Sequence, residues 1–223
     1  VWEQRGGEDV FREEKSRSTE QALALYPKLR RRINQSDDPF ETAVRLSIAG
    51  NIIDLGTQDT HADLEETIAR SLREPLAVDH LSRLRERVHE VETILYLGDN
   101  AGETVFDRLL IETLQVPVTY VVRGGPIFND AILEDAYAAG LDEVADKIIS
   151  NGSRAPGTVL RSCSQAFRDQ FHQAPLIIAK GQGNYETVGD MDEKVFCLFQ
   201  VKCPVIGRDL DVPVGSLIVR QGG

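Results

Sequence analysis

Apolar residues recur at helical spacing through the first part of the chain. Ala22, Leu25 and Leu29 lie three or four positions apart, the spacing that places side chains on one face of a helix. The same pattern returns several times, and we expect helices at 18–32, 40–53, 64–72 and 78–88. The sequence therefore predicts a helical N-terminal region over residues 1–92.

From Thr93 onward, short continuous apolar runs alternate with segments of helical spacing. Such runs are typical of strands that are buried on both faces of a sheet. Strands are expected at 93–97, 118–122, 147–149, 176–179, 196–201 and 216–219, with helices at 105–113, 130–139 and 158–171. Alternation of strand and helix favours right-handed βαβ units. We therefore expect an α/β fold, three layers deep (α/β/α), with a mostly parallel Rossmann-like sheet in a domain at 93–223.

Composition and charge narrow the classes of function. The 223 residues are 41% hydrophobic and 27% charged, as in an ordinary globular protein, and no apolar run approaches the roughly 20 residues that span a bilayer. A net charge of −11 argues against a nucleic-acid partner, because phosphate backbones need Lys and Arg. No signal peptide is recognisable, and three cysteines at irregular spacing fit a reducing compartment. These features predict a cytoplasmic protein without a membrane partner.

Polar residues and glycines follow four of the expected strands directly. In an open parallel sheet the ligand site lies beyond the carboxyl ends of the strands, so these segments are the candidates for a site. They are Gly98–Glu103, Arg123–Pro126, Ser150–Ser153 and Lys180–Glu186. Four polar strand ends are hard to explain as generic turns, which favours a common site.

Asp99 and Asn100 offer a carboxylate and an amide oxygen, which are hard ligands of the kind that Mg²⁺ and Mn²⁺ prefer. A plain helix cap is the alternative interpretation of this pair. Gly98 and Gly102 would let the backbone approach a ligand closely, and the following helix would present amides to an anion.

Three further strand ends supply candidate substrate ligands. Lys180 can contact phosphate as a point charge, and the hydroxyl and amides around Ser153 form a possible anion nest, although turn chemistry explains the latter equally well. Asn184 and Glu186 are candidates for orienting substrate or water. Asn51 and Asp54, where polar residues interrupt an apolar helix, are further candidates.

The segment from Asn129 to Asp135 carries two carboxylates. Asp130 or Asn129 is a natural N-cap for the helix expected there, and Asn129 is a candidate substrate ligand. Asp135 lies five positions after Asp130 and does not share its helix face, so spacing leaves it either a solvated acid or a site residue.

The sequence argues against several other kinds of site. The four histidines show no metal-ligand spacing with one another or with cysteine, which argues against zinc. Neither a Gly-x-Ser-x-Gly elbow nor a Walker loop occurs.

Taken in order, the motifs resemble the damage-control phosphatase family, especially its short prokaryotic branch. That family was once catalogued as a domain of unknown function and was also described as acidic-residue methyltransferases. The resemblance covers roughly residues 40–219 and rests on Gly50–Asp54, Asp99–Glu103, Gly125–Asp135, Lys180–Glu186 and Lys202-Cys203-Pro204. The Cys-x-x-Cys segment with which the prokaryotic branch usually begins does not occur in this sequence.

The resemblance implies hydrolysis of phosphate esters of sugars or of damaged cofactor intermediates, with Mn²⁺, Ni²⁺, Co²⁺ or Mg²⁺. It also implies that Asp99, Asn100 and Asp135 hold the metal. On this hypothesis Lys180 holds a phosphate oxygen and either Asp130 or Glu103 takes the proton of the attacking water. A covalent phosphoenzyme at Asp99 is less favoured, because a metal ligand is a poorer nucleophile. The rival functions are an S-adenosylmethionine-dependent methyltransferase and a non-catalytic metabolite-binding protein.

Overall fold

A single seven-stranded sheet runs through the described part of the chain, which is residues 9–52 and 61–223 of the computed structural model. The strand order is β1-β7-β6-β5-β2-β3-β4, and every neighbouring pair is parallel except β6 and β7. The strands are β1 (Leu76–Asp79), β2 (Ile94–Leu97), β3 (Val118–Val122), β4 (Lys147–Ser150), β5 (Ile177–Lys180), β6 (Val195–Gln200) and β7 (Leu217–Gln221). The mostly parallel α/β sheet that the sequence predicts is confirmed.

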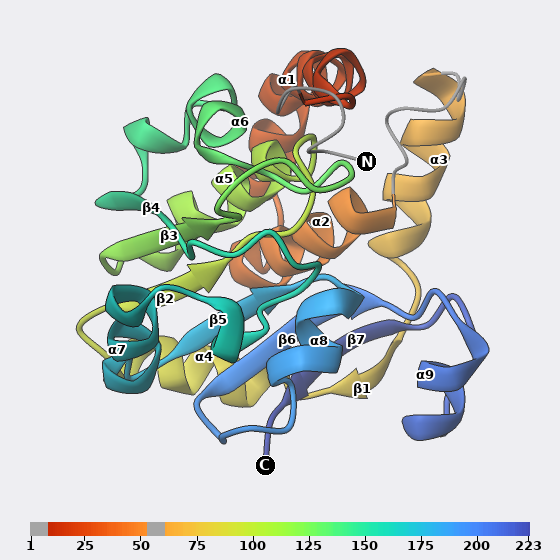
Figure 1. Ribbon diagram of the computed structural model, residues 1–223. Coiled ribbons are helices and arrows are strands. Elements are labelled where there is room, and N and C mark those ends of the chain that lie inside the picture. Colours follow the sequence, from red (N-terminus) through yellow and green to blue (C-terminus); the bar gives the residue numbers. More distant parts are fainter. Residues whose placement is uncertain (1–8, 53–60) are drawn as a thin grey trace.

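Helices cover both faces of this sheet and complete three layers (Figure 1). One hydrophobic cluster joins strand residues to α1, α2 and α5, and a second joins the opposite strand face to α7 and α8. The helices are α1 (Arg12–Asn34), α2 (Pro39–Ile52), α3 (His61–Ser71), α4 (Leu81–Glu90), α5 (Thr104–Leu114), α6 (Leu133–Ala138), α7 (Gln165–Gln173), α8 (Gln182–Val188) and α9 (Pro204–Asp209). Short 3₁₀ turns lie at Leu141–Glu143 and Leu160–Ser162.

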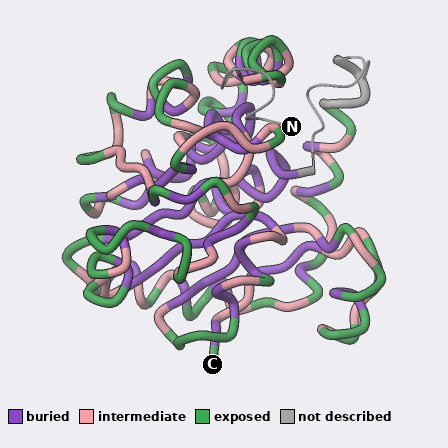
Figure 2. The backbone as a smooth tube through the Cα atoms, viewed as in Figure 1, coloured by how far each residue is buried: buried purple, intermediate pink, exposed green. Residues whose placement is uncertain are grey.

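The strands are buried along both faces because their side chains alternate between the two clusters. In β2, Ile94 and Tyr96 point to the α1–α2–α5 side, while Leu95 and Leu97 point to the α7–α8 side. The central strands are accordingly buried throughout in Figure 2. This double burial explains why the strands read as continuous apolar runs in the sequence.

β2 lies at the point where the order of the parallel strands reverses. The chain proceeds from β2 to β3 and β4 on one side, and β5 then pairs with the other side of β2. The carboxyl ends of adjacent strands diverge at such a switch point, which makes it the usual ligand position in open α/β sheets. Asp99 follows β2 and Lys180 closes β5, so both lie at this position.

Three expected elements differ from the structure. The helix expected at 78–88 is strand β1 followed by α4, which begins where the side chain of Asp79 accepts a hydrogen bond from the Leu81 amide at 3.0 Å. The helix expected at 158–171 begins only at Gln165, after the N-cap Ser164. The helix expected at 130–139 is the shorter α6, which begins only at Leu133.

The N-terminal helices share a core with the sheet. Residues of α1 and α2 belong to the same hydrophobic cluster as Phe106 and Tyr120, and β1 pairs with β7. A strand thus lies within the range 1–92, where only helices were expected. The division at residue 92 as a boundary between folding units stays a prediction. Within residues 9–52 and 61–223, no helix combines the length and the apolar character needed to cross a membrane.

Candidate functional site

The loop after β3 folds back onto the loop after β2. Asn100 and Asp130 form an isolated antiparallel bridge, the Ala131 amide donates to the Asp99 carbonyl at 2.8 Å, and the Ala101 amide donates to the Asn129 carbonyl at 2.9 Å. These backbone bonds fix Asp130 beside the Asp99–Asn100 pair. The helix expected from Asp130 begins only at Leu133, which leaves Asp130 in the loop and free to reach the site.

Arg123 ties two of these carboxylates together. Its Nε donates to Oδ2 of Asp130 at 2.6 Å, and its NH2 lies 3.3 Å from Oδ1 of Asp99. The side chain is only 2% exposed. The sequence placed Arg123 in a candidate segment after a largely buried strand but gave it no individual role.

Glu103 and Asp107 hold the ammonium of Lys180 behind this cluster. The Nζ of Lys180 lies 2.5 Å from Oε1 of Glu103 and 2.7 Å from Oδ1 of Asp107, and it donates to the Ser47 carbonyl at 2.9 Å. All three ammonium protons therefore have acceptors, and none of these three side chains is exposed to solvent. The expectation that Lys180 contacts phosphate does not match this arrangement, because the ammonium has no donor left.

Asp107 was not predicted, and it anchors the buried end of this network. Besides Lys180, it accepts hydrogen bonds from the hydroxyls of Tyr96 at 2.8 Å and Tyr120 at 2.7 Å. Glu103, the N-cap of α5, and Asp107, in its first turn, lie four positions apart beside the buried apolar residues Val105 and Phe106. Two acids on one face of such a helix are a sequence signal for a buried cation between them.

Asn51 approaches the cluster from α2. Its Nδ2 donates to Oδ2 of Asp99 at 3.1 Å and to Oε2 of Glu103 at 2.9 Å. Asn100 reaches the same two carboxylate oxygens through its own Nδ2, both at 3.2 Å. Asn51, a candidate from the sequence, therefore lies at the carboxylate cluster, whereas Asp54 lies outside the described residues.

The crowding of carboxylates sets their protonation. Burial raises the pKa of Asp99 to about 7, the charges of Glu103 and Asp130 add to the rise, and Arg123 opposes it. Burial also raises the pKa of Asp130, again against the opposing charge of Arg123. Among the described residues, Asp99, Glu103, Asp107 and Asp130 form ion pairs with two cationic side chains, Arg123 and Lys180, while Lys202 and Lys15 act on Asp99 and Asp130 from farther away. The cluster therefore lacks positive charge.

Asp135, which the family resemblance implies as a metal ligand, contacts Lys15 and the start of α6 rather than the carboxylates of Asp99 and Asp130. Its Oδ2 accepts from the Ile132 amide at 2.9 Å, as an acid at the third helical position does, and lies 2.6 Å from Nζ of Lys15. Lys15 is 1% exposed and also binds Asp9 at 2.7 Å. Asp135 thus serves a buried ion-pair group that links α1 to α6.

The remaining predicted substrate ligands have other bonding partners. Asn184 is fully buried, donates to the carbonyls of Gly98 and Lys180, and accepts from Thr158 at 2.7 Å. The amide of Ser153 donates to Oδ1 of Asn151 at 2.8 Å, and its hydroxyl pairs with Ser162. Glu186 is exposed and accepts from Gln182. These contacts explain the three residues as structural, and Asn129 contributes its backbone carbonyl to the loop pairing described above.

A metal site at this position needs an amide ligand beside the carboxylates. In the described ranges, no three His, Cys, Asp or Glu side chains are arranged to hold a metal ion by themselves. Asp99, Asn100 and Asp130 nevertheless bring two carboxylates and one amide together. Nδ2 of Asn100 faces Asp99 here, and an amide that turned its oxygen to a cation would complete a set of oxygen ligands that suits Mg²⁺ or Mn²⁺. The deficit of positive charge fits a divalent cation, and at Gly181 a Cβ would overlap the Asp99 carboxylate, so the close packing here requires glycine.

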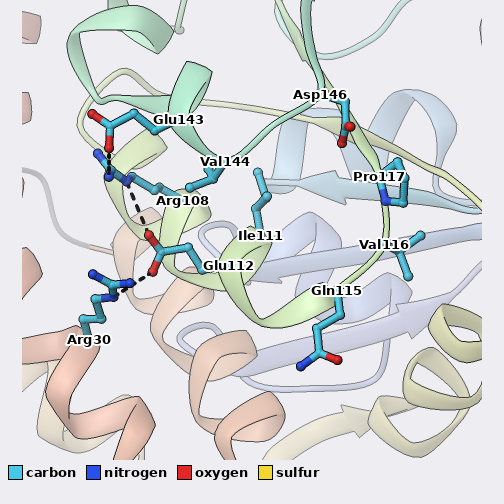
Figure 3. Close-up of a pocket in the computed structure, with 10 residues that line it drawn as sticks. All are labelled: Arg30, Arg108, Ile111, Glu112, Gln115, Val116, Pro117, Glu143, Val144 and Asp146. Atoms are coloured by element: carbon cyan, nitrogen blue, oxygen red, sulfur yellow. Dashed lines mark hydrogen bonds and ion pairs between the residues drawn. The ribbon is translucent and has the colours of Figure 1, made fainter.

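A separate hollow of about 630 Å³ lies at the amino ends of the strands, beside the segments that precede β3 and β4 (Figure 3). Four of its charged residues bind one another: Arg30 and Arg108 both pair with Glu112, and Arg108 also pairs with Glu143 at 2.5 Å. The hollow shares no lining residue with the acidic cluster.

Known proteins match nearly the whole length of this chain. Over 218 residues the chain is 40% identical to a damage-control phosphatase of Pyrococcus horikoshii, covering 96% of this chain and 75% of that protein. It is 37% identical over 228 residues to a damage-control phosphatase of Archaeoglobus fulgidus, covering 99% of this chain and 78% of that protein.

A crystal structure of a DUF89 family protein from Pyrococcus horikoshii superposes with a TM-score of 0.91 at 38% identity, covering all of this chain and 78% of that one. The family model of the damage-control phosphatase ARMT1-like domain matches residues 1–218. The resemblance that the motifs indicated is thereby confirmed, and the chain belongs to the family of damage-control phosphatase ARMT1-like domains.

Proposed function

We propose that this protein is a metal-dependent phosphatase that hydrolyses phosphate monoesters of small metabolites, such as sugar phosphates or damaged cofactor intermediates. The observation that carries the proposal is the convergence of Asp99, Asn100 and Asp130 at the switch point of the sheet. Relatives that cover nearly the whole chain bear the name damage-control phosphatase, which supports the same reaction class.

The divalent cation, Mn²⁺, Ni²⁺, Co²⁺ or Mg²⁺, would be held by Asp99, Asn100 and Asp130. When bound, such a cation supplies positive charge that binds phosphate oxygen and stabilises the charge developing in the transition state. Arg123 holds the carboxylates of Asp99 and Asp130 in place from the side. Asp130 therefore takes the position that the resemblance had given to Asp135.

The backbone at the start of α5 offers a contact for the phosphate. Within the described residues the amide of Gly102 donates to no acceptor, and it lies just before the N-terminus of an eleven-residue helix. Helix N-termini favour anions through free amides and the helix dipole. We assign this amide, rather than Lys180, to a phosphate oxygen.

Glu103 is the residue that we assign as general base. Of the two candidates, Asp130 is committed to Arg123 and to the cation, whereas Glu103 has one oxygen on Lys180 and turns the other towards Asn51 and Asn100. Lys180 and Asp107 act as positioning residues, because they orient Glu103 without reaching the substrate. A covalent intermediate at Asp99 is disfavoured, because a carboxylate that holds the cation is a poorer nucleophile.

The proposal is tested by release of inorganic phosphate from a panel of sugar phosphates and phosphorylated cofactor precursors, each with the four cations in turn. We expect turnover by the wild type and loss of turnover in Asp99→Ala. Asp142→Ala, which removes an exposed carboxylate on the 3₁₀ turn after α6, is the matched control and should remain active. Undiminished turnover in Asp99→Ala would contradict the assignment, and tight binding of S-adenosylmethionine by calorimetry would favour the methyltransferase alternative.

A further inference from the structure

Asn51 has a fixed orientation between two carboxylates. It is 3% exposed, and its Nδ2 is shared between Asp99 at 3.1 Å and Glu103 at 2.9 Å. Ionised carboxylates only accept hydrogen bonds, so they hold the NH₂ end of the amide towards themselves. The Oδ1 atom must therefore face away from both carboxylates.

The Oδ1 atom of Asn51 is buried and has no hydrogen-bond partner within the described structure. A buried acceptor without a donor costs about 1–3 kcal/mol, and such atoms call for an explanation. Only two other side-chain atoms among the described residues share this condition, Nε of Arg108 and Nδ2 of Asn151, and neither contacts the acidic cluster.

The missing partner is either a hydrogen-bond donor or a cation, and the proposed cation already has Asp99, Asn100 and Asp130 as ligands. Phosphate oxygens of an ionised ester accept hydrogen bonds, so Oδ1 is unsuited to bind the phosphoryl group. An attacking water, by contrast, brings two O–H donors, and Oε2 of Glu103 lies 2.9 Å from Nδ2 of the same Asn51 amide. Oδ1 belongs to the same amide as Nδ2, so the free acceptor on Asn51 and Oε2 of Glu103, which already accepts from Asn51 and Asn100, lie within reach of a single bridging water.

We propose that Asn51 Oδ1 and Glu103 together seat the attacking water, with Asn51 as the positioning residue that accepts one O–H while Glu103 accepts the other. This role rests on the proposed phosphatase function. The water oxygen forms the new bond to phosphorus as the bond to the ester oxygen breaks, and that bonding pair leaves with the alkoxide. The proton of the water passes to Glu103, and the alkoxide takes a proton from solvent.

A binding position with two hydrogen-bond acceptors favours water over an alcohol as the nucleophile. Water can satisfy both acceptors, whereas methanol has a single O–H and leaves one of them unpaired. The wild type should therefore transfer the phosphoryl group to water in preference to methanol. Removing the Asn51 acceptor should reduce this preference, because both nucleophiles then find only Glu103.

The test is the ratio of methyl phosphate to inorganic phosphate, formed from p-nitrophenyl phosphate in a methanol–water mixture with Mn²⁺ and followed by phosphorus NMR. In Asn51→Leu and Asn51→Ala we expect this ratio to rise about fivefold, which corresponds to one hydrogen bond of about 1 kcal/mol. Asn151→Ala is the matched control, because it removes another buried amide with an unpaired atom, and its ratio should equal that of the wild type.

Calorimetric titration of Mn²⁺ supplies a readout that does not depend on turnover. The dissociation constant of both Asn51 variants should rise by no more than about 10–100-fold, because they lose the hydrogen bond from Nδ2 to Asp99 but keep the proposed ligands Asp99, Asn100 and Asp130. An unchanged product ratio would overturn the role, and so would a loss of Mn²⁺ affinity well beyond that range, because Asn51 would then hold the cation. If the wild type releases no phosphate with any cation, the proposed function fails, and this role fails with it.

Discussion

Asn100 and Asp130 pair across an antiparallel bridge between the loops that follow β2 and β3. The bridge brings the carboxylate of Asp130 next to the Asp99–Asn100 pair, while Asp135 binds Lys15 at 2.6 Å. A site that spans two loops depends on this pairing, because neither loop alone supplies enough oxygen ligands for a cation.

Asp99→Asn should stabilise the metal-free protein while it abolishes activity. The folded state keeps a proton on Asp99 up to about pH 7, whereas the unfolded chain releases it near pH 3.9. The folded state therefore binds more protons between these values, and the wild-type free energy of unfolding falls as the pH rises from about 4 to 7.

The variant should gain about 1–2 kcal/mol over the wild type above pH 7, and this gain should vanish near pH 4. Urea unfolding with a chelator at pH 4.5 and pH 8 measures both values. Equal free energies of unfolding of the two proteins at pH 8 would show that burial and the neighbouring charges do not destabilise ionised Asp99.

Affinity for Mn²⁺ should rise with pH up to about 7 and then level off. A cation must displace the proton from Asp99, whose pKa is raised to about 7 by burial and by the charges of Glu103 and Asp130. Below that value we expect about a tenfold gain in affinity per pH unit, because one proton is released. Calorimetry in buffers of different ionisation enthalpy would count the protons, and a release of none at pH 6 would contradict this.

Lys180→Met should destabilise the protein severely, by about 3–5 kcal/mol, because it leaves Glu103 and Asp107 buried without their cation. Adding Asp107→Asn should restore part of the loss, since one uncompensated charge is removed. Denaturant unfolding of the single and double variants measures this coupling. A Lys180→Met protein as stable as the wild type, with only a raised KM, would instead support the phosphate contact expected from the sequence.

Lys15→Met should cost about 1–3 kcal/mol of unfolding free energy, because Asp9 and Asp135 then face each other without a cation. The penalty should shrink when Asp135→Asn is already present, and a double-mutant cycle by urea unfolding measures this coupling. Strictly additive losses would mean that the three residues do not act as one group.

The fold was largely predictable because its strands are buried on both faces. Apolar runs such as Val118–Val122 stand out from helical spacing, and the position of Asp99 after such a run located the site. The short strand β1 was not predicted, because the helical spacing of Leu81, Leu84 and Val88 continues back towards Asp79. A four-residue strand offers too little pattern of its own to compete.

The choice between Asp130 and Asp135 was beyond the sequence because it depends on where α6 begins. A start at Leu133 puts Asp130 in a loop and Asp135 at the third helical position, where an acid caps the helix. Lys15, which binds Asp135, is distant in sequence and carries no local signal for the contact. The contacts of Lys180 were not apparent from the sequence, because its partners, Glu103 just before α5 and Asp107 within it, lie more than 70 positions away along the chain.

The assignment of the third ligand is tested most directly by titrating Mn²⁺ into Asp130→Asn and Asp135→Asn, with circular dichroism to confirm that both variants are folded. The account predicts that Asp130→Asn weakens Mn²⁺ binding by more than about 100-fold, while Asp135→Asn binds within a few-fold of the wild type. The reverse result, with binding lost in Asp135→Asn and kept in Asp130→Asn, would contradict it.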